Sequence, residues 1–273
     1  MDLPPGFKNR GGKGKVCGLR KSLYGLKQSS RAWFERFGRV IKSHGYNQGQ
    51  ADHTMFYRHT DGDKVAILIV YVDDIILTGD DSNEIERLKK ILAKEFKIKD
   101  LGNLKYFLGM EFARSNKGIF VSQRKYILDL LGEIGLLRCK AAETPIEPNL
   151  ILQPANPEEV INREQYQRLV GKLLSLSHTW PNIAFATSVV CQFMHSSGPE
   201  HFEAVYKFLR YLKGTPGKGL LFGGYGNLQV EIYTDADWAG SVIDRRSTSG
   251  YCTFVEGNLV TWRCKKQSVV ARE

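Results

Sequence analysis

The sequence is poor in the features that mark secreted, zinc-binding or membrane proteins. Its five cysteines are an odd number and form no C-x-x-C pair, which argues against a disulfide framework and against a zinc site. The longest apolar run, residues 65–72, ends at two aspartates and is far too short to cross a bilayer. The first residues lack the charged and apolar regions of a signal peptide. We therefore expect an intracellular protein, cytoplasmic or nuclear, with no membrane contact.

Acidic residues are also scarce at the start of the chain, which is strongly basic. The net charge is +10 over 273 residues. Residues 1–40 contribute +8 of it, because they contain ten Lys or Arg residues and only two acidic residues, Asp2 and Glu35. Such a concentration of cations suits a polyanion such as nucleic acid. A solvated basic surface explains the same charge, and the two interpretations stay open. Apolar residues make up 42%, enough for a packed core.

The first half of the sequence predicts a helix, a hairpin and a second helix. Apolar residues recur at helical spacing from Ser30 until the stop at His44-Gly45. After a short strand at 54–58, the β-branched runs 65–72 and 75–78 are separated only by Asp73-Asp74, which predicts a tight hairpin of buried strands. Residues 79–82 then cap a helix whose apolar positions extend to Phe96.

The second half predicts another hairpin, a helical region and a final group of strands. A turn at 115–118 joins strands at 106–112 and 119–122, and a helix follows over 123–137. The proline-rich stretch 141–157 is the best linker, and two or three helices fill 163–213. Strands are expected at 228–234, 250–255 and 258–263, in a second domain that begins near 226.

The adjacent carboxylates of Asp73 and Asp74 are the strongest candidate for chemistry. Two charges at the tip of an apolar hairpin are costly unless a counter-ion offsets them, and hard oxygen ligands suit Mg²⁺. Polymerases use two such ions to clamp the attacking and leaving oxygens of phosphoryl transfer. An ordinary Asp-rich turn is the alternative. The apolar flanking strands favour the metal site over the turn.

An ordered series of short motifs runs along nearly the whole chain, on both sides of the YVDD tetrapeptide at 71–74. These motifs are KSLYGLKQ at 21–28, RAWF at 31–34, KDLG at 99–102, YFLG at 106–109, SQRKY at 122–126, RLVGKL at 168–173, YLKGT at 211–215, YTDADWAG at 233–240, RRSTSG at 245–250 and KKQ at 265–267. The series resembles the reverse transcriptases of copia-type retrotransposons, and YVDD is similar to their Y-x-D-D motif.

The resemblance implies an α+β fold: a partial right-hand polymerase palm and thumb, followed by an incomplete ribonuclease H-like domain. Residues 1–147 would form the partial reverse transcriptase, with a fingers remnant and a palm that includes the primer-grip hairpin. Residues 148–225 would supply thumb and connection helices, and residues 226–273 would begin the ribonuclease H-like domain. The aromatic residues of the primer-grip hairpin are equally well explained as ordinary core.

The resemblance also assigns roles to single residues. Asp73 and Asp74 would bind the catalytic Mg²⁺ ions of the polymerase, and Asp235 would be the first metal-binding aspartate of the ribonuclease H site. The residues expected at the nucleotide and template are Gln28, Lys27, Arg31 and Tyr71. The implied partners are an RNA template and a DNA primer, and no protein partner is indicated.

Each metal site is expected to be represented only in part. The family's third polymerase carboxylate lies upstream of the PPGF segment at 4–7, where this sequence has only Asp2. The next ribonuclease H ligand is expected beyond Glu273. Three functions therefore stay open: an RNA-directed DNA polymerase, a catalytically inactive remnant that still binds nucleic acid, and an interaction module that reuses the palm sheet.

Overall fold

The computed structural model describes residues 25–26, 28–148, 150–224, 226 and 229–271. The chain divides into two compact units, Met1–Gly102 and Asn103–Glu273. Among the described residues, each unit has its own cluster of buried apolar side chains. Of the basic segment 1–40, residues 1–24 and Lys27 lie outside the described residues.

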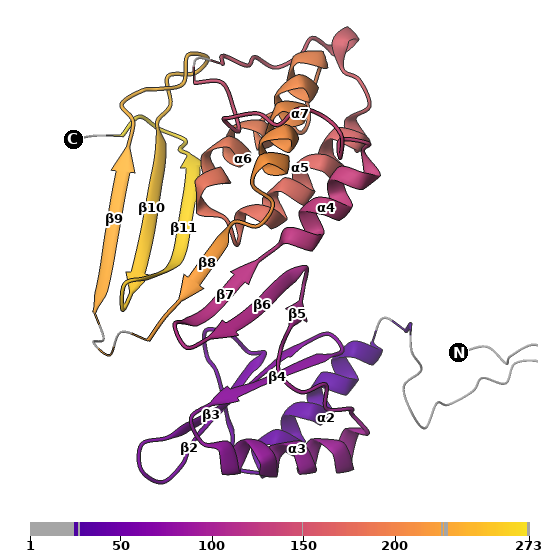
Figure 1. The fold of residues 1–273 in the computed structure, drawn as a ribbon, viewed down its shortest axis with the longest axis vertical. Helices are drawn as coiled ribbons and strands as arrows, with labels where there is room; N and C mark the ends of the chain where they lie inside the picture. The colour runs from indigo at the N-terminus through magenta and orange to yellow at the C-terminus, as the bar shows by residue number, and fades with distance from the viewer. Residues whose placement is uncertain (1–24, 27, 149, 225, 227–228, 272–273) are drawn as a thin grey trace, which may run out of the picture. The chain divides into compact units, whose positions relative to one another are not determined.

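The first unit is an antiparallel sheet with two helices on one face (Figure 1). The strands β1 (Asn47–Gln48), β2 (Met55–His59), β3 (Val65–Tyr71) and β4 (Asp74–Gly79) follow one another in the sheet in sequence order. The helices α2 (Ser29–Ser43) and α3 (Ser82–Phe96) bury Phe37, Ile41, Leu88 and Leu92 against it. The predicted helices and hairpin are thus confirmed.

One detail of the predicted hairpin is wrong: its strands are not buried on both faces. Ala66, Leu68 and Val70 of β3 are buried, whereas the residues that alternate with them are only half-buried. Successive side chains of a strand point to opposite faces, and helices cover only one face of this sheet. The other face is open within the unit.

Local signals explain where the two helices begin and end. The carboxylate of Asp81 accepts a hydrogen bond from the backbone N–H of Glu84 at 3.0 Å, which caps the start of α3. α2 ends at His44, and Gly45 follows with a φ of +88°, a left-handed conformation that glycine adopts without strain.

The second unit begins with a four-stranded antiparallel sheet. β5 (Tyr106–Phe107), β6 (Met110–Ser115), β7 (Gly118–Ser122) and β8 (Gly219–Phe222) lie in this order. The predicted continuous strand over 106–112 is wrong, because Leu108 and Gly109 both have positive φ and turn the chain back on itself. β8 was not expected, and it pairs with β7 across a long stretch of intervening sequence.

Four helices pack around the main core of the second unit. They are α4 (Arg124–Glu133), α5 (Arg163–Ser177), α6 (Ala184–Cys191) and α7 (Pro199–Gly214), with short 3-10 turns at η1 (Pro157–Glu159) and η2 (Pro181–Ile183). Tyr166, Leu173, Val205 and Phe208 are fully buried between them. Two or three helices were expected within 163–213, and the described chain has three there, whereas α4 ends earlier than the predicted Leu137.

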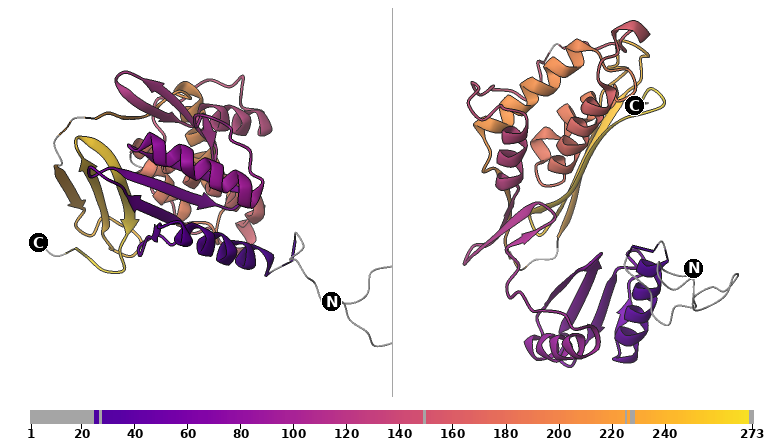
Figure 2. Two further views of the ribbon diagram at one scale, coloured as in Figure 1. Left: turned by 90° about the horizontal axis from the view of Figure 1, so that it is seen from below. Right: turned by 90° about the vertical axis from the view of Figure 1, so that its right-hand side faces the viewer.

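The expected final strands form a second antiparallel sheet in this unit. β9 (Val230–Ala236), β10 (Thr248–Val255) and β11 (Asn258–Lys266) lie in the order β11-β10-β9. β11 is the strand beside α5 and α6 (Figures 1 and 2), and the indole Nε1 of Trp262 donates to the backbone carbonyl of Ser177 at 2.8 Å.

The described chain is therefore an α+β protein with antiparallel sheets. Among the residues that the structure describes, no helix is long and apolar enough to cross a membrane. The domain boundaries predicted at 147/148 and 225/226 come from family motifs. The two compact units are defined instead by contacts between residues, so they do not test these boundaries, which stay predictions.

Candidate functional site

The turn between β3 and β4 places two aspartates at the end of the sheet. Tyr71 pairs with Asp74, so the turn itself consists of Val72 and Asp73, and Asp74 is already the first residue of β4. The prediction that Asp73 and Asp74 together form the turn is thus shifted by one residue. Val72 has a φ of +53° and its side chain is 71% exposed. A β-branched residue in this left-handed region is strained.

Neither aspartate contacts a polar partner in the part of the chain that the structure describes. Asp73 and Asp74 are exposed, and within the described part of the chain their carboxylates make no hydrogen bond or ion pair. Most other acidic residues of this unit behave differently: Asp52, Asp81, Glu84 and Asp100 all accept hydrogen bonds. No described residue therefore offsets the two adjacent negative charges.

The open face of the sheet leads up to these carboxylates. Met55, Ile69 and Ile76 are cross-strand neighbours on that face, and the pair Tyr71 and Asp74 forms the next row. Cross-strand partners point to the same face of a sheet, so Asp74 lies beside the half-exposed ring of Tyr71 at the edge of an apolar strip.

The N-terminal end of α2 lies toward the same end of the sheet. Its C-terminal end is held at the opposite end, where the carbonyl of His44 accepts from Arg58 and Arg87 at 3.3 and 3.4 Å. Toward its start, the ring of Trp33 lies 6.1 Å from that of Phe96 at the far end of α3. A helix of this length rises about 22 Å, similar to the length of β3, so the start of α2 reaches the level of the turn.

Two of the residues predicted at the nucleotide and template lie at this start of α2. The backbone carbonyl of Gln28 accepts from Ala32 at 3.0 Å, and Gln28 is exposed. Arg31 is 86% exposed and pairs with Glu35 at 3.1 Å. Lys27, the third, lies outside the described residues. The structure thus brings Gln28 and Arg31 to the end of the unit that carries Asp73, Asp74 and Tyr71.

The carboxylate pair fits a magnesium ion as far as its donor chemistry goes. Mg²⁺ is bound by oxygen ligands and commonly takes only one or two carboxylates, with waters and substrate phosphates completing its shell. Asp73 and Asp74 supply that number. In the described part of the chain, no group of three or more His, Cys, Asp or Glu side chains converges on a metal site.

The second unit carries the other candidate aspartate, Asp235, on β9. Asp235 is exposed, pairs with Gly250 of β10, and its carboxylate has no partner among the described residues. Asp237, two residues later, has a structural role: its Oδ1 accepts from the backbone N–H of Gly240 at 2.9 Å. The nearby hydroxyl of the buried Ser247 accepts from Ala239 and Ala271 at 3.1 and 2.8 Å.

A concavity on the sheet beside Asp235 was not predicted. It measures about 530 Å³ and is lined by Asp235, Tyr251 and the cations Arg263 and Lys265, among others. Tyr251 and Arg263 are cross-strand partners, as are Ser249 and Lys265. The cations at 263 and 265 alternate at the end of the predicted strand 258–263 and just beyond it, and this alternation was the signal that would have identified a basic face.

The family comparison agrees with the motifs. Residues 1–148 match the family described as reverse transcriptase (RNA-dependent DNA polymerase). This match covers the first unit and extends through the β5–β7 hairpins and α4 of the second.

Similar proteins include long polyproteins and a shorter relative. The chain is 37% identical over its whole length to the retrovirus-related Pol polyprotein from transposon RE1 of Arabidopsis thaliana, and covers 18% of that protein. It is 38% identical over 99% of its length to the corresponding polyprotein from transposon TNT 1-94 of Nicotiana tabacum, and covers 21% of it. An uncharacterized mitochondrial protein of Arabidopsis thaliana is 38% identical over 75% of this chain and 85% of its own length. The chain thus spans about a fifth of the polyproteins that it matches.

Proposed function

We propose that this chain, which belongs to the reverse transcriptase family, carries an RNA-directed DNA polymerase site at the β3–β4 turn. The chain corresponds to part of a copia-type retrotransposon Pol polyprotein. One observation carries the proposal. Asp73 and Asp74 are adjacent, exposed and without a counter-ion among the described residues, at a strained turn that ends an apolar hairpin. Strained backbone conformations cluster at functional sites in proteins.

In this proposal the two carboxylates hold Mg²⁺, which supplies charge stabilisation to the oxygens of a nucleotidyl transfer. The short turn fixes the backbone positions from which the carboxylates of Asp73 and Asp74 project. Arg31, exposed at the start of α2, contacts a phosphate of the nucleic acid, and Gln28 hydrogen-bonds to the nucleotide or template. Tyr71 supports the substrate from the open face of the sheet.

The finer division of the chain is part of the same proposal. The first unit is the palm with a remnant of the fingers, and β5–β7 form the primer grip. The helices α4 to α7 belong to the thumb and connection. β9, β10 and β11 are the first strands of a ribonuclease H-like domain, in which Asp235, without a partner among the described residues, would bind a metal ion. The exposure of Asp235 and the structural role of Asp237 support this choice between the two acids.

Primer extension by the full chain tests the polymerase site. On an RNA template with a DNA primer, extension should require Mg²⁺, and Asp73→Asn or Asp74→Asn should reduce its rate at least about 100-fold, since losing a metal carboxylate removes several kcal/mol of transition-state stabilisation. Asp61→Asn is the matched control, because Asp61 is an exposed aspartate in the turn at the other end of β3. Full extension by Asp73→Asn would refute the assignment.

The competing function is that of an inactive remnant. It predicts that the wild-type chain binds the primer–template with a strong dependence on salt, yet extends no primer at any Mg²⁺ concentration. Measuring binding and extension on the same preparation separates the two functions.

A further inference from the structure

A groove runs along β11 in the second unit. It has a volume of about 700 Å³, and every residue of Val260–Lys266 lines it. Its other wall is formed by the end of α5 and by α6, including Leu174, Thr187 and Ser188. A groove lined by consecutive residues of one strand follows that strand lengthwise, and seven residues of strand span about 23 Å.

The strand in this groove has a free edge. β11 is the last strand of its sheet, and its backbone is hydrogen-bonded only to β10 among the described residues. α6 packs against the half-buried side chains of the strand, where Trp262 and Cys264 lie. The outward N–H and C=O groups of β11 therefore alternate along the groove as donors and acceptors without a protein partner in the described chain.

The side chains of the groove add cationic and apolar character. Arg263 and Lys265 are exposed on the same face of β11, and neither has an acidic partner among the described residues. The lining residues include no Asp or Glu, while Trp262 and Leu174 contribute apolar surface. Lys266 is neutralised by Asp244 at 2.9 Å.

A buried hydroxyl in the same groove also lacks a partner. Thr187 is 2% exposed, and its Oγ1 has no hydrogen-bond partner among the described residues. The wall of the groove is therefore not fully satisfied by internal hydrogen bonds.

We propose that this groove binds an extended acidic peptide, which adds as a strand to the free edge of β11. A peptide backbone satisfies alternating N–H and C=O groups, whereas nucleic acid phosphates satisfy only the donors. Acidic side chains at every second position meet Arg263 and Lys265, and the small apolar residues between them meet Trp262 and Cys264. The same two cations repel β11 of a second copy, which disfavours self-pairing at this edge.

Fluorescence anisotropy with a labelled acetyl-Glu-Val-Glu-Val-Glu-Val-amide peptide and the full chain tests the proposal. Binding should weaken with salt and should fall at least tenfold in the double variant Arg263→Glu/Lys265→Glu. The Lys-Val counterpart of the peptide should bind that variant better than the wild type. A peptide that is N-methylated at each valine should not bind, because it cannot donate along the strand edge.

The matched control is Arg138→Glu/Lys140→Glu, which makes the same charge change at two exposed residues with the same spacing away from the groove. It should bind the peptide like the wild type, and thermal unfolding should show that both double variants are folded. Three results would overturn the proposal. These are no binding at millimolar peptide, equal binding of the N-methylated peptide, or displacement by an oligonucleotide whose own affinity falls in Arg263→Glu/Lys265→Glu.

Discussion

At the scale of single residues, the acidic side chains of the chain divide into two kinds. Asp81, Glu84 and Asp237 accept hydrogen bonds that hold a helix start, a helix–sheet contact and a loop. Asp73, Asp74 and Asp235 hold nothing within the described residues. Sequence motifs predicted metal sites at the second kind, and the structure adds that their carboxylates are exposed and make no contact with another described polar group.

His201 is a buried titratable group of α7. It is 2% exposed, its Nδ1 accepts from the backbone N–H of Gly198 at 3.0 Å, and its ring lies 4.5 Å from that of Phe193. The backbone of Gln153 and the carboxylate of Glu200 favour its charged form, and burial opposes it more strongly. Burial lowers the pKa of His201 below its ordinary value of 6.5, because the cation is poorly solvated there.

The depressed pKa predicts that low pH destabilises the second unit. Below pH 6.5 the unfolded chain takes up a proton that the folded His201 does not, so the unfolding free energy is complete above pH 6.5 and declines as pH falls toward the folded pKa. Urea denaturation between pH 8 and 5.5 measures this. His201→Phe should remove the decline, whereas His178→Gln, at an exposed histidine, should keep it. An unchanged decline in His201→Phe would contradict the prediction.

At the scale of elements, local patterns predicted more than distant pairings. The spacing of Trp33, Phe37 and Ile41 predicted α2, and the β-branched runs around Asp73 predicted the β3–β4 hairpin. β8 was missed because Gly219–Phe222 is short and pairs with residues far away in sequence. The break at Leu108 was missed because a leucine with positive φ leaves no mark in hydrophobic spacing.

For the candidate site, too, the sequence predicted which residues take part but not how the chain arranges them. The motif around Tyr71 identified Asp73 and Asp74, but the left-handed backbone of Val72 and the one-residue shift of the turn depend on how the two strands pair. That Gln28 lies toward the turn depends on the packing of α2 along the sheet, which a linear sequence does not specify.

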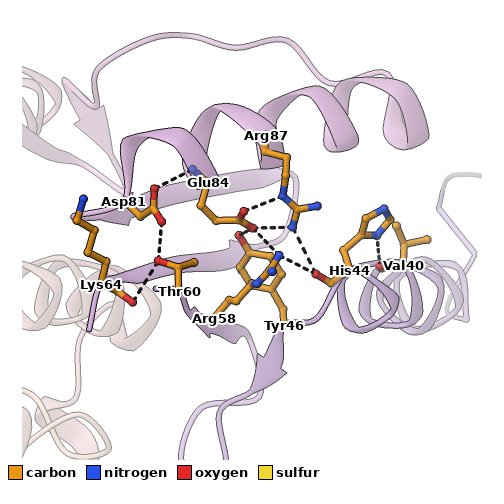
Figure 3. A network of polar contacts seen from close by, with 9 residues as sticks. All are labelled: Val40, His44, Tyr46, Arg58, Thr60, Lys64, Asp81, Glu84 and Arg87. Atoms are coloured by element: carbon orange, nitrogen blue, oxygen red, sulfur yellow. Dashed lines mark hydrogen bonds and ion pairs between the residues drawn. The ribbon is translucent and has the colours of Figure 1, made fainter. Parts of the chain in front are cut away.

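One polar network joins three elements of the first unit (Figure 3). The carboxylate of Glu84 on α3, 7% exposed, accepts from Tyr46 at 2.9 Å, from Arg58 of β2 at 3.2 Å and from Arg87 at 2.7 Å. Both arginines also donate to the carbonyl of His44 at the end of α2. The network fixes the ends of both helices against the sheet, at the end opposite the aspartates.

Removing the carboxylate of Glu84 should therefore destabilise the first unit. Glu84→Gln leaves two arginines without their anion, and we expect a loss of about 2–3 kcal/mol, below the figure for fully buried pairs because Arg58 and Arg87 are partly exposed. Glu86→Gln breaks only the exposed pair with Lys89 on the same helix and should cost less than about 1 kcal/mol. Equal losses in urea denaturation would show that the network contributes nothing special.

The network also has a pH dependence of known sign. The hydrogen bond from Arg87 and those from other donors keep the pKa of Glu84 below its ordinary value of 4.5, although burial opposes this. Its contribution to stability is therefore present above pH 4.5 and is lost as pH falls through the lower, folded pKa.

At the scale of the whole molecule, the chain has two cores and a short connection. The described residues of each unit bury their own apolar cluster. Residues 97–105, between α3 and β5, form no helix or strand. Leu101 in that stretch is 81% exposed. Backbone without burial or regular hydrogen bonds opens easily to proteases.

Limited trypsin digestion should thus cut first in this connection. Within residues 28–224, we expect the earliest cleavage after Lys97, Lys99 or Lys105, which are all exposed, followed by slow loss of two stable fragments. Mass spectrometry of a time course identifies the sites. Replacing these three lysines with glutamine should delay the appearance of both fragments. Early cuts inside α3 or α5 would instead indicate that the units are not compact on their own.

The backbone of Val72 has a consequence for which substitutions the chain tolerates. Its side chain is mostly exposed, yet its φ of +53° suits glycine or asparagine better than valine. Variation at this position is therefore limited by conformation and not by volume or polarity. In a library of variants at position 72, the stability of each variant should follow how readily its residue adopts a positive φ. The turn should keep its shape even where the residue between Tyr71 and Asp73 changes.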